Sequence, residues 1–134
     1  MTWEQLRELK KTGLFDIQSH TYWHPNFKKE RKKLSGPALD QLVMNQLRKS
    51  RARLETELGG HVDLLAWPFG INDDYLIGKA AEAGYVATFT IDRRHATAAD
   101  PVMKLPRYLL VNADSGKAFV QLLEGNAVKR SVVH

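Results

Sequence analysis

Apolar residues along the chain follow two spacings, and these spacings predict alternating helices and strands. Short runs rich in β-branched and aromatic residues predict strands at residues 14–19, 62–67, 85–91 and 108–111. Apolar positions three or four residues apart predict helices at about residues 3–12, 36–58, 73–83 and 115–124. The order α, β, α, β, α, β, β, α indicates an α/β fold with a mostly parallel sheet and helices packed outside it.

Capping patterns support the predicted helix limits. Residues 2–5, Thr-Trp-Glu-Gln, form a capping-box pattern at the start of the first helix. Asn72 is expected to cap the third helix, which places the aspartates at 73–74 in its first turn, where the helix dipole favours carboxylates. Asp114 or Ser115 is expected to cap the last helix. Loops are expected at residues 20–35 and 92–104.

The length of 134 residues indicates one domain, spanning residues 1–134. The chain has no cysteine, which excludes disulfides and thiolate metal sites. No apolar run approaches the roughly 20 residues that cross a bilayer, so no transmembrane segment is expected. The N-terminus lacks the pattern of a signal peptide, so we expect no export signal in this sequence, and it does not indicate a cellular location.

The net charge of +5 raises the question of an anionic partner. Basic residues cluster at 28–33 and again between 48 and 53, as solvated loops and helix faces commonly do. They are not interleaved with aromatic residues, and the chain has no helix-turn-helix, RNP or zinc-finger signature. We therefore expect no nucleic acid partner, while an anionic polymer or membrane surface stays open.

Two histidines follow the first predicted strand. His20 and His24 are four residues apart, and neutral imidazole is the commonest metal ligand among side chains. The alternative to a metal site is that these are two unrelated loop histidines, since the four-residue spacing alone is a weak pattern. The carboxyl ends of parallel strands gather at one edge of a sheet, where functional residues concentrate. The segment at residues 67–69 and the residues after Ile91 are expected at that same edge.

Three motifs in order resemble one family. Residues 19–25, Ser-His-Thr-Tyr-Trp-His-Pro, are similar to the His-Ser/Thr-x-x-His metal motif of the polysaccharide deacetylases, which carry the NodB-homology domain. Residues 66–70, Ala-Trp-Pro-Phe-Gly, resemble the groove-wall motif one strand later. Residues 105–108, Leu-Pro-Arg-Tyr, also look like the poly-N-acetylglucosamine deacetylase subgroup. The resemblance extends to about residue 123.

This resemblance implies a partial distorted (β/α) barrel and metal-dependent hydrolysis of the acetamide of an N-acetylated sugar polymer. Such a hydrolase uses a divalent ion, zinc in the first place, with nickel, cobalt or iron as alternatives. By matching position, the metal ligands are His20 and His24. The expected substrate contacts are Tyr22, Trp23, Trp67, Pro68 and Phe69. Arg107 is expected to orient a catalytic aspartate or bind an acetamide oxygen, with a surface ion pair as the alternative.

The departures from the family pattern concern the acidic residues. Members carry Thr-Phe-Asp-Asp upstream of the histidines, supplying the catalytic base and the third metal ligand, and nothing here matches it. The aspartates at 73–74 are expected in the first turn of a helix, and Asp16 is expected to have a structural role. Ala66 replaces an arginine that many members place there to pair with the base. The family's acid histidine, in a Leu-x-His near the domain end, has no clear match, residues 132–134 included.

The chain is therefore expected to be the C-terminal part of such a domain, without its N-terminal strands. Alone it should hydrolyse little or nothing, because the base and the third metal ligand are missing. The alternative is a non-catalytic carbohydrate-binding or interaction module. Full-length members are usually exported, periplasmic or on the cell surface. Because a half barrel leaves strand edges open, we expect two copies to pair or the N-terminal helix to cover the gap.

Overall fold

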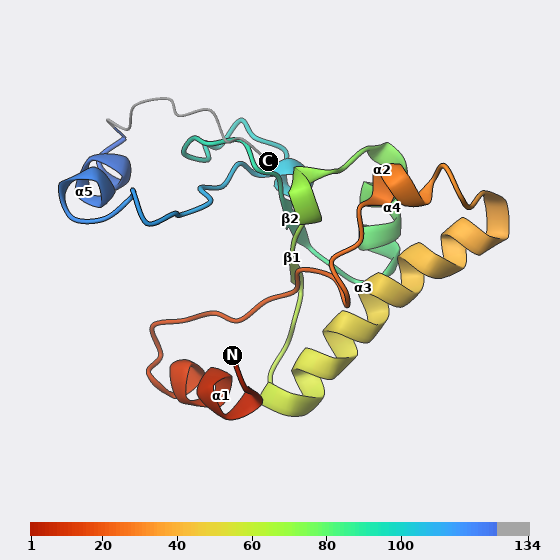
Figure 1. Cartoon of the computed structure of the whole chain (residues 1–134), viewed down its shortest axis with the longest axis horizontal. Helices are drawn as coiled ribbons and strands as arrows, with labels where there is room; N and C mark the ends of the chain where they lie inside the picture. The colour runs from red at the N-terminus through yellow and green to blue at the C-terminus, as the bar shows by residue number, and fades with distance from the viewer. Residues whose placement is uncertain (126–134) are drawn as a thin grey trace.

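The computed structural model describes residues 1–125, and helices alternate with short strands along them (Figure 1). The predicted α/β class is confirmed. Within the described residues, no helix is both long and apolar enough to cross a membrane. The elements are α1 (Trp3–Lys11), α2 (Phe27–Glu30), α3 (Gly36–Leu58), β1 (Leu64–Ala66), η1 (Pro68–Gly70), α4 (Asp74–Glu82), β2 (Ala87–Phe89), η2 (Val102–Lys104) and α5 (Lys117–Leu123).

Four parallel backbone segments form the sheet. β1 pairs with β2 in parallel, with Leu65 opposite Thr88. Single parallel bridges add one segment at each side, Ser19 beside Leu65 and Leu105 beside Phe89. The predicted parallel arrangement is confirmed, and it places the ends of all four segments along one edge.

The two outer segments are less regular than predicted. The run at 14–19 was expected to be a buried strand, but only Ser19 pairs with β1, and Leu14 and Phe15 are 83% and 53% exposed. At the other side, the predicted strand at 108–111 is absent, because pairing occurs earlier, at Leu105. Both runs have strand-like composition, but no described segment lies beyond them to complete their hydrogen bonds or to bury them.

Helix starts also differ in three places. The predicted loop at 20–35 contains α2, capped by Asn26. The cap of α4 is Asp73 rather than Asn72, since the Asp73 carboxylate accepts the amide hydrogen of Leu76. α5 starts after Gly116 without a side-chain cap, because the carboxylate of Asp114 instead accepts the amide hydrogen of Val111 and pairs with Arg93.

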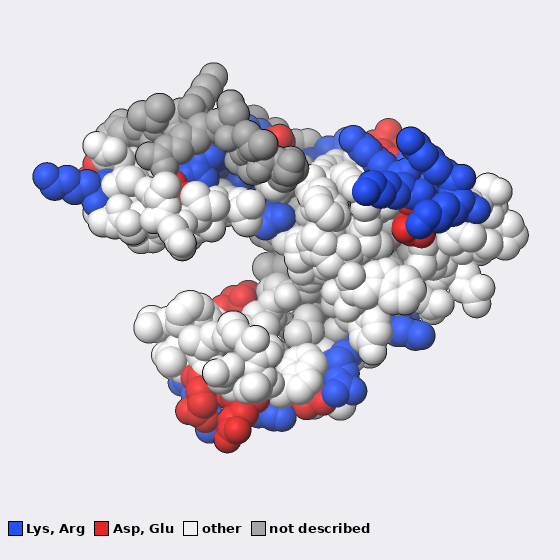
Figure 2. Space-filling view, viewed as in Figure 1, with Lys and Arg blue, Asp and Glu red and all other residues white. Residues whose placement is uncertain are grey.

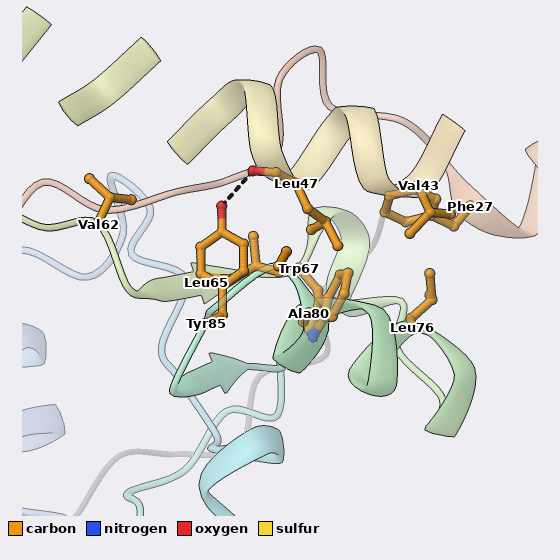
Figure 3. Close-up of a cluster of buried hydrophobic side chains, with 10 residues drawn as sticks. Phe27, Val43, Leu47, Val62, Leu65, Trp67, Leu76, Ala80 and Tyr85 are labelled. Atoms are coloured by element: carbon orange, nitrogen blue, oxygen red, sulfur yellow. Dashed lines mark hydrogen bonds between the residues drawn. The ribbon is translucent and has the colours of Figure 1, made fainter. Parts of the chain in front are cut away.

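The core lies between the sheet and the helices α3 and α4 (Figure 3). The indole of Trp67 is fully buried and donates from Nε1 to Thr88 Oγ1 at 3.0 Å. The hydroxyl of Tyr85 donates to the Leu47 carbonyl at 2.9 Å, so the ring crosses the core from sheet to helix. Burying each such side chain stabilises the fold by about 1.5–3 kcal/mol. The remaining main members are Phe27, Val43, Val62, Leu65, Leu76 and Ala80.

Within residues 1–125, nothing covers the opposite face of the sheet. Leu65 is buried against the helices, whereas its neighbours Leu64 and Ala66 point the other way and line a hollow of about 560 Å³ together with Phe89. Figure 2 shows a deep notch between the part that carries α1 and the part that carries α5. α1 packs against α3, so it does not cover this face as one of our expectations had it. Parallel sheets are normally covered on both faces, so the described residues alone leave this sheet half covered.

Candidate functional site

The two predicted histidines lie side by side at the end of the first sheet segment. Ser19 is the last residue that pairs with β1, and the chain then turns through residues 20–26 before α2. The imidazole centroids of His20 and His24 are 4.8 Å apart, and their planes are tilted by 60°. The structure therefore brings together the pair that the four-residue spacing singled out.

A main-chain carbonyl orients His20. Its Nδ1 lies 2.6 Å from the Ala66 oxygen at the end of β1. Because a carbonyl only accepts hydrogen bonds, Nδ1 carries the hydrogen and Nε2 keeps a free lone pair. One side of the ring faces solvent, but desolvation by the surrounding protein still lowers the pKa of His20. The positive charges of His24 and Arg107 lower that pKa further, against the opposing effect of the Ala66 bond. The lowered pKa favours the neutral ring, which is the form that binds a metal.

The spacing of the rings fits one shared ion. A zinc ion about 2.1 Å from an imidazole nitrogen lies about 3.2 Å from that ring's centroid, so two rings on a tetrahedral ion have centroids about 5 Å apart. The observed 4.8 Å agrees. Among residues 1–125, no third histidine, cysteine or carboxylate joins the pair. These residues therefore supply two ligands and leave the other positions to water or to groups from elsewhere.

The backbone at this site is strained. Among the described residues, three that are not glycine have positive φ: Thr21 at 69°, His24 at 62° and Phe69 at 56°. A left-handed conformation costs roughly 1–2 kcal/mol for a residue with a Cβ. Such residues persist where the surrounding structure fixes them, and they concentrate at functional sites. Here all three lie in the two loops that meet at His24.

Phe69 forms the aromatic wall beside the histidines. Its ring centroid lies 4.7 Å from that of His24, edge to face, and the side chain is 41% exposed. Trp67 and Pro68 were also expected to line the groove, but both are buried. Trp67 continues the strand alternation on the helix-facing side and packs edge-on against Phe27. These two residues support the wall from behind, and of the three residues 67–69 only Phe69 is exposed enough to contact a substrate.

The other predicted contacts divide in the same way. Tyr22 and Trp23 are 51% and 65% exposed beside the histidines, as a sugar contact requires. Among the described residues, Arg107 bonds to main-chain carbonyls rather than forming the surface ion pair given as the alternative. Its Nε donates to the Thr90 carbonyl at 2.6 Å and an Nη to the Trp67 carbonyl at 3.2 Å, so it ties the ends of β2 and β1 together. Burial lowers the pKa of this guanidinium, which lines the same hollow as His20.

The aspartates lie apart from the histidine pair, as expected, although Asp73 is the cap of α4 rather than a residue of its first turn. Asp73 caps α4 and the side chain of Asp74 is fully exposed near Lys104, so neither approaches the histidines. Asp16 accepts a hydrogen bond from Gln18 at 2.8 Å. Residues 132–134, which did not match the family's acid histidine, lie outside the described part. The Ala66 carbonyl is a part of the site that the motifs did not indicate, although the pairing of Ser19 with the strand that carries Ala66 brings this carbonyl near His20.

Comparison with known proteins gives one family. The family described as polysaccharide deacetylase matches residues 1–88. A poly-beta-1,6-N-acetyl-D-glucosamine N-deacetylase of Staphylococcus aureus is 26% identical over 121 residues, which are 90% of this chain and 40% of that protein. One from Staphylococcus epidermidis is 26% identical over 122 residues, covering 91% of this chain and 42% of the relative. The chain thus spans about two fifths of the length of these relatives.

Solved structures share the fold. The Streptococcus pyogenes deacetylase PplD, in complex with acetate, superposes with a TM-score of 0.74 at 24% identity, covering 91% of this chain and 50% of the other. IcaB from Ammonifex degensii gives a TM-score of 0.67 at 21% identity, covering 94% and 53%. The predicted NodB-type fold is confirmed as a partial barrel, and about half of each neighbour has no counterpart in this chain.

Proposed function

The chain belongs to the polysaccharide deacetylase family, and we propose that it forms the two-histidine part of a metal-dependent polysaccharide N-deacetylase site. The substrate class is a polymer containing N-acetylglucosamine, in keeping with the names of the relatives. One observation carries the proposal. His20 is fixed by the Ala66 carbonyl so that Nε2 is free, and this ring lies next to His24 and the exposed Phe69.

The proposed ion is divalent, zinc in the first place, with nickel, cobalt or iron as alternatives. When bound, such an ion polarises an acetyl carbonyl and acidifies its water. His20 offers Nε2 as a ligand and keeps its other nitrogen on Ala66, which prevents the ring from turning. His24 supplies the second nitrogen. Phe69, Tyr22 and Trp23 present exposed aromatic surface for the apolar faces of sugar rings.

The proposed site lacks a carboxylate base among the described residues. Hydrolysis needs a group that takes the proton of the attacking water, and no carboxylate there joins the histidines. We therefore expect this chain to bind an ion weakly and to show little or no hydrolysis by itself.

Calorimetric titration with zinc tests the ion site. The wild type, His20→Ala and His24→Ala are compared, with His61→Ala as the matched control because His61 is an exposed histidine outside the site. Binding should be lost in the first two variants and retained in the control. Equal binding by all four proteins would remove the proposed ligands. Turnover of an N-acetylglucosamine oligomer by the wild type would contradict the expected inactivity.

The second candidate is a non-catalytic carbohydrate-binding module. The two-ligand set in the described residues favours it, since binding a sugar polymer needs the aromatic wall but not the ion. NMR titration with an N-acetylglucosamine oligomer separates the two functions. Shifts at Phe69 that are unchanged by a chelator and by His20→Ala would favour the binding module. Shifts that require zinc would favour the deacetylase site.

A further inference from the structure

The two loops that meet at the site are joined a second time at their far ends. The loop after Ser19 carries His24 and leads into α2, while the loop after β1 carries Phe69 and leads into α4. Beyond them, Arg31 pairs with Asp73 through two hydrogen bonds. One joins Nη2 to Oδ1 at 2.9 Å and the other joins Nη1 to Oδ2. The guanidinium–carboxylate pair therefore joins the two loops a second time, beyond the His24–Phe69 contact. Residues 20–26 are called the histidine loop below.

A wider network anchors this ion pair. The Arg31 guanidinium lies 5.0 Å from the ring centroid of Tyr75. The hydroxyl of Tyr75 donates to Asp40 on α3 at 2.5 Å. Desolvation and the Asp40 carboxylate raise the pKa of Tyr75 to about 12, so the hydroxyl stays a donor. Arg31 holds the pKa of Asp73 below its usual value. The cluster thus fixes the segment after α2 to both α3 and α4.

The histidine loop needs such an anchor for two reasons. Thr21, His24 and Phe69 are all in the left-handed region, and strained residues persist only where their surroundings determine them. α2 has four residues, and Phe27 is its only buried member, so it is too short to be stable by itself. Without Arg31, the main contacts that hold the segment between Ser19 and α3 would be the buried Phe27, the His20–Ala66 hydrogen bond and the hydrogen bond from the Trp23 amide to Gln46.

We propose that Arg31 and Asp73 are positioning residues, whose ion pair holds His24 against Phe69 and beside His20. The effect on ion binding rests on the proposed function. The effect on the ring contact does not, because it concerns the geometry of the protein alone.

Asp73→Asn and Arg31→Gln test the proposal. Asparagine caps a helix as well as aspartate, so Asp73→Asn removes the charge and keeps the start of α4. The matched control is Asp100→Asn, which removes the charge from the Arg94–Asp100 pair, away from the site. The first readout is the NMR contact between the rings of His24 and Phe69 without metal. The second is the zinc dissociation constant. Thermal unfolding of each variant accompanies both.

Both site variants should weaken the ring contact and raise the zinc dissociation constant by about tenfold, as for residues that orient a metal ligand. Their double variant should be no worse than either single one, since both remove one interaction. Arg31→Lys should restore part of the effect, because lysine keeps the charge but not the fork. The control should behave like the wild type.

An unchanged ring contact in both site variants would overturn the proposal. Global unfolding of both at the temperature of measurement would also overturn it, since the pair would then support the whole fold rather than position the loop. If the wild type binds no zinc, the proposed function fails, and the ring contact still tests the positioning role.

Discussion

Gly70 belongs to the groove-wall motif at residues 66–70, and replacing it with alanine should clearly lower the free energy of unfolding. It has φ of +66°, and a Cβ built on it would lie 2.4 Å from Cγ2 and 2.8 Å from Cβ of Ile91. Atoms this close cannot coexist, and the nearest ones belong to a β-branched side chain that cannot swing away freely. Gly70→Ala should therefore force apart the loop after β1 and the end of the segment that follows β2.

The magnitude follows from two contributions. The left-handed backbone costs an alanine roughly 1–2 kcal/mol, and overpacking against Ile91 costs about 1–3 kcal/mol. Gly70→Ala should thus lower the free energy of unfolding by about 2–5 kcal/mol. Gly13 is the matched control, because it has φ of +71° and nothing within 4 Å of a Cβ placed on it. Gly13→Ala should show the backbone contribution alone.

Urea unfolding followed by circular dichroism measures these differences. Adding Ile91→Ala to Gly70→Ala removes the clashing atoms, so the pair should be less destabilising than the sum of the two single variants by about 1–3 kcal/mol. The prediction is refuted if Gly70→Ala destabilises no more than Gly13→Ala, or if the Gly70 and Ile91 changes are additive.

Three further predictions concern the core, the pH dependence and the open face. Trp67→Phe should lower the free energy of unfolding by about 1–3 kcal/mol, since it removes the indole bond to Thr88 and leaves a gap; wild-type stability in urea would contradict this. The folded-state pKa of Asp73 is depressed by Arg31, so its contribution to stability is present above the unfolded pKa of about 3.9 and is lost as pH falls through the folded value. Asp73→Asn should therefore flatten the loss of stability in acid, and a parallel pH profile in thermal melts would count against it. We also predict that two copies pair through the open strand edges, so sedimentation should show concentration-dependent dimers that Leu110→Lys, at the 53% exposed Leu110, weakens; monomers at every concentration would exclude this.

The helices and the parallel order could be predicted because their signals are local. The capping box at Thr2 is present as expected, and α3 buries Val43 and Leu47 of its predicted stripe. The strands predicted at 14–19 and 108–111 do not form as expected. Composition shows only that a segment can adopt a strand, whereas strand pairing also requires a neighbouring segment. Their apolar side chains stay exposed where the described chain offers no neighbour.

The site was predictable in its histidines and only partly in their surroundings. The spacing of His20 and His24 after a strand places both rings at one edge, which local sequence can suggest. The burial of Trp67 depends on which side of β1 faces the helices, and the motif letters alone do not contain that information. Asn72 and Asp73 are equally good caps by residue type. The partner of Asp73, Arg31, lies 42 residues away, so no local pattern indicates it.

The proposed site depends above all on His20 and His24 binding one divalent ion beside Phe69. Anomalous diffraction at the zinc edge, from crystals of the wild-type chain soaked in zinc, tests it most directly. The account predicts one peak about 2.1 Å from a nitrogen of each ring, on the Nε2 side of His20. A peak at other residues with none between these two rings, or rings that point away from one another, would contradict it.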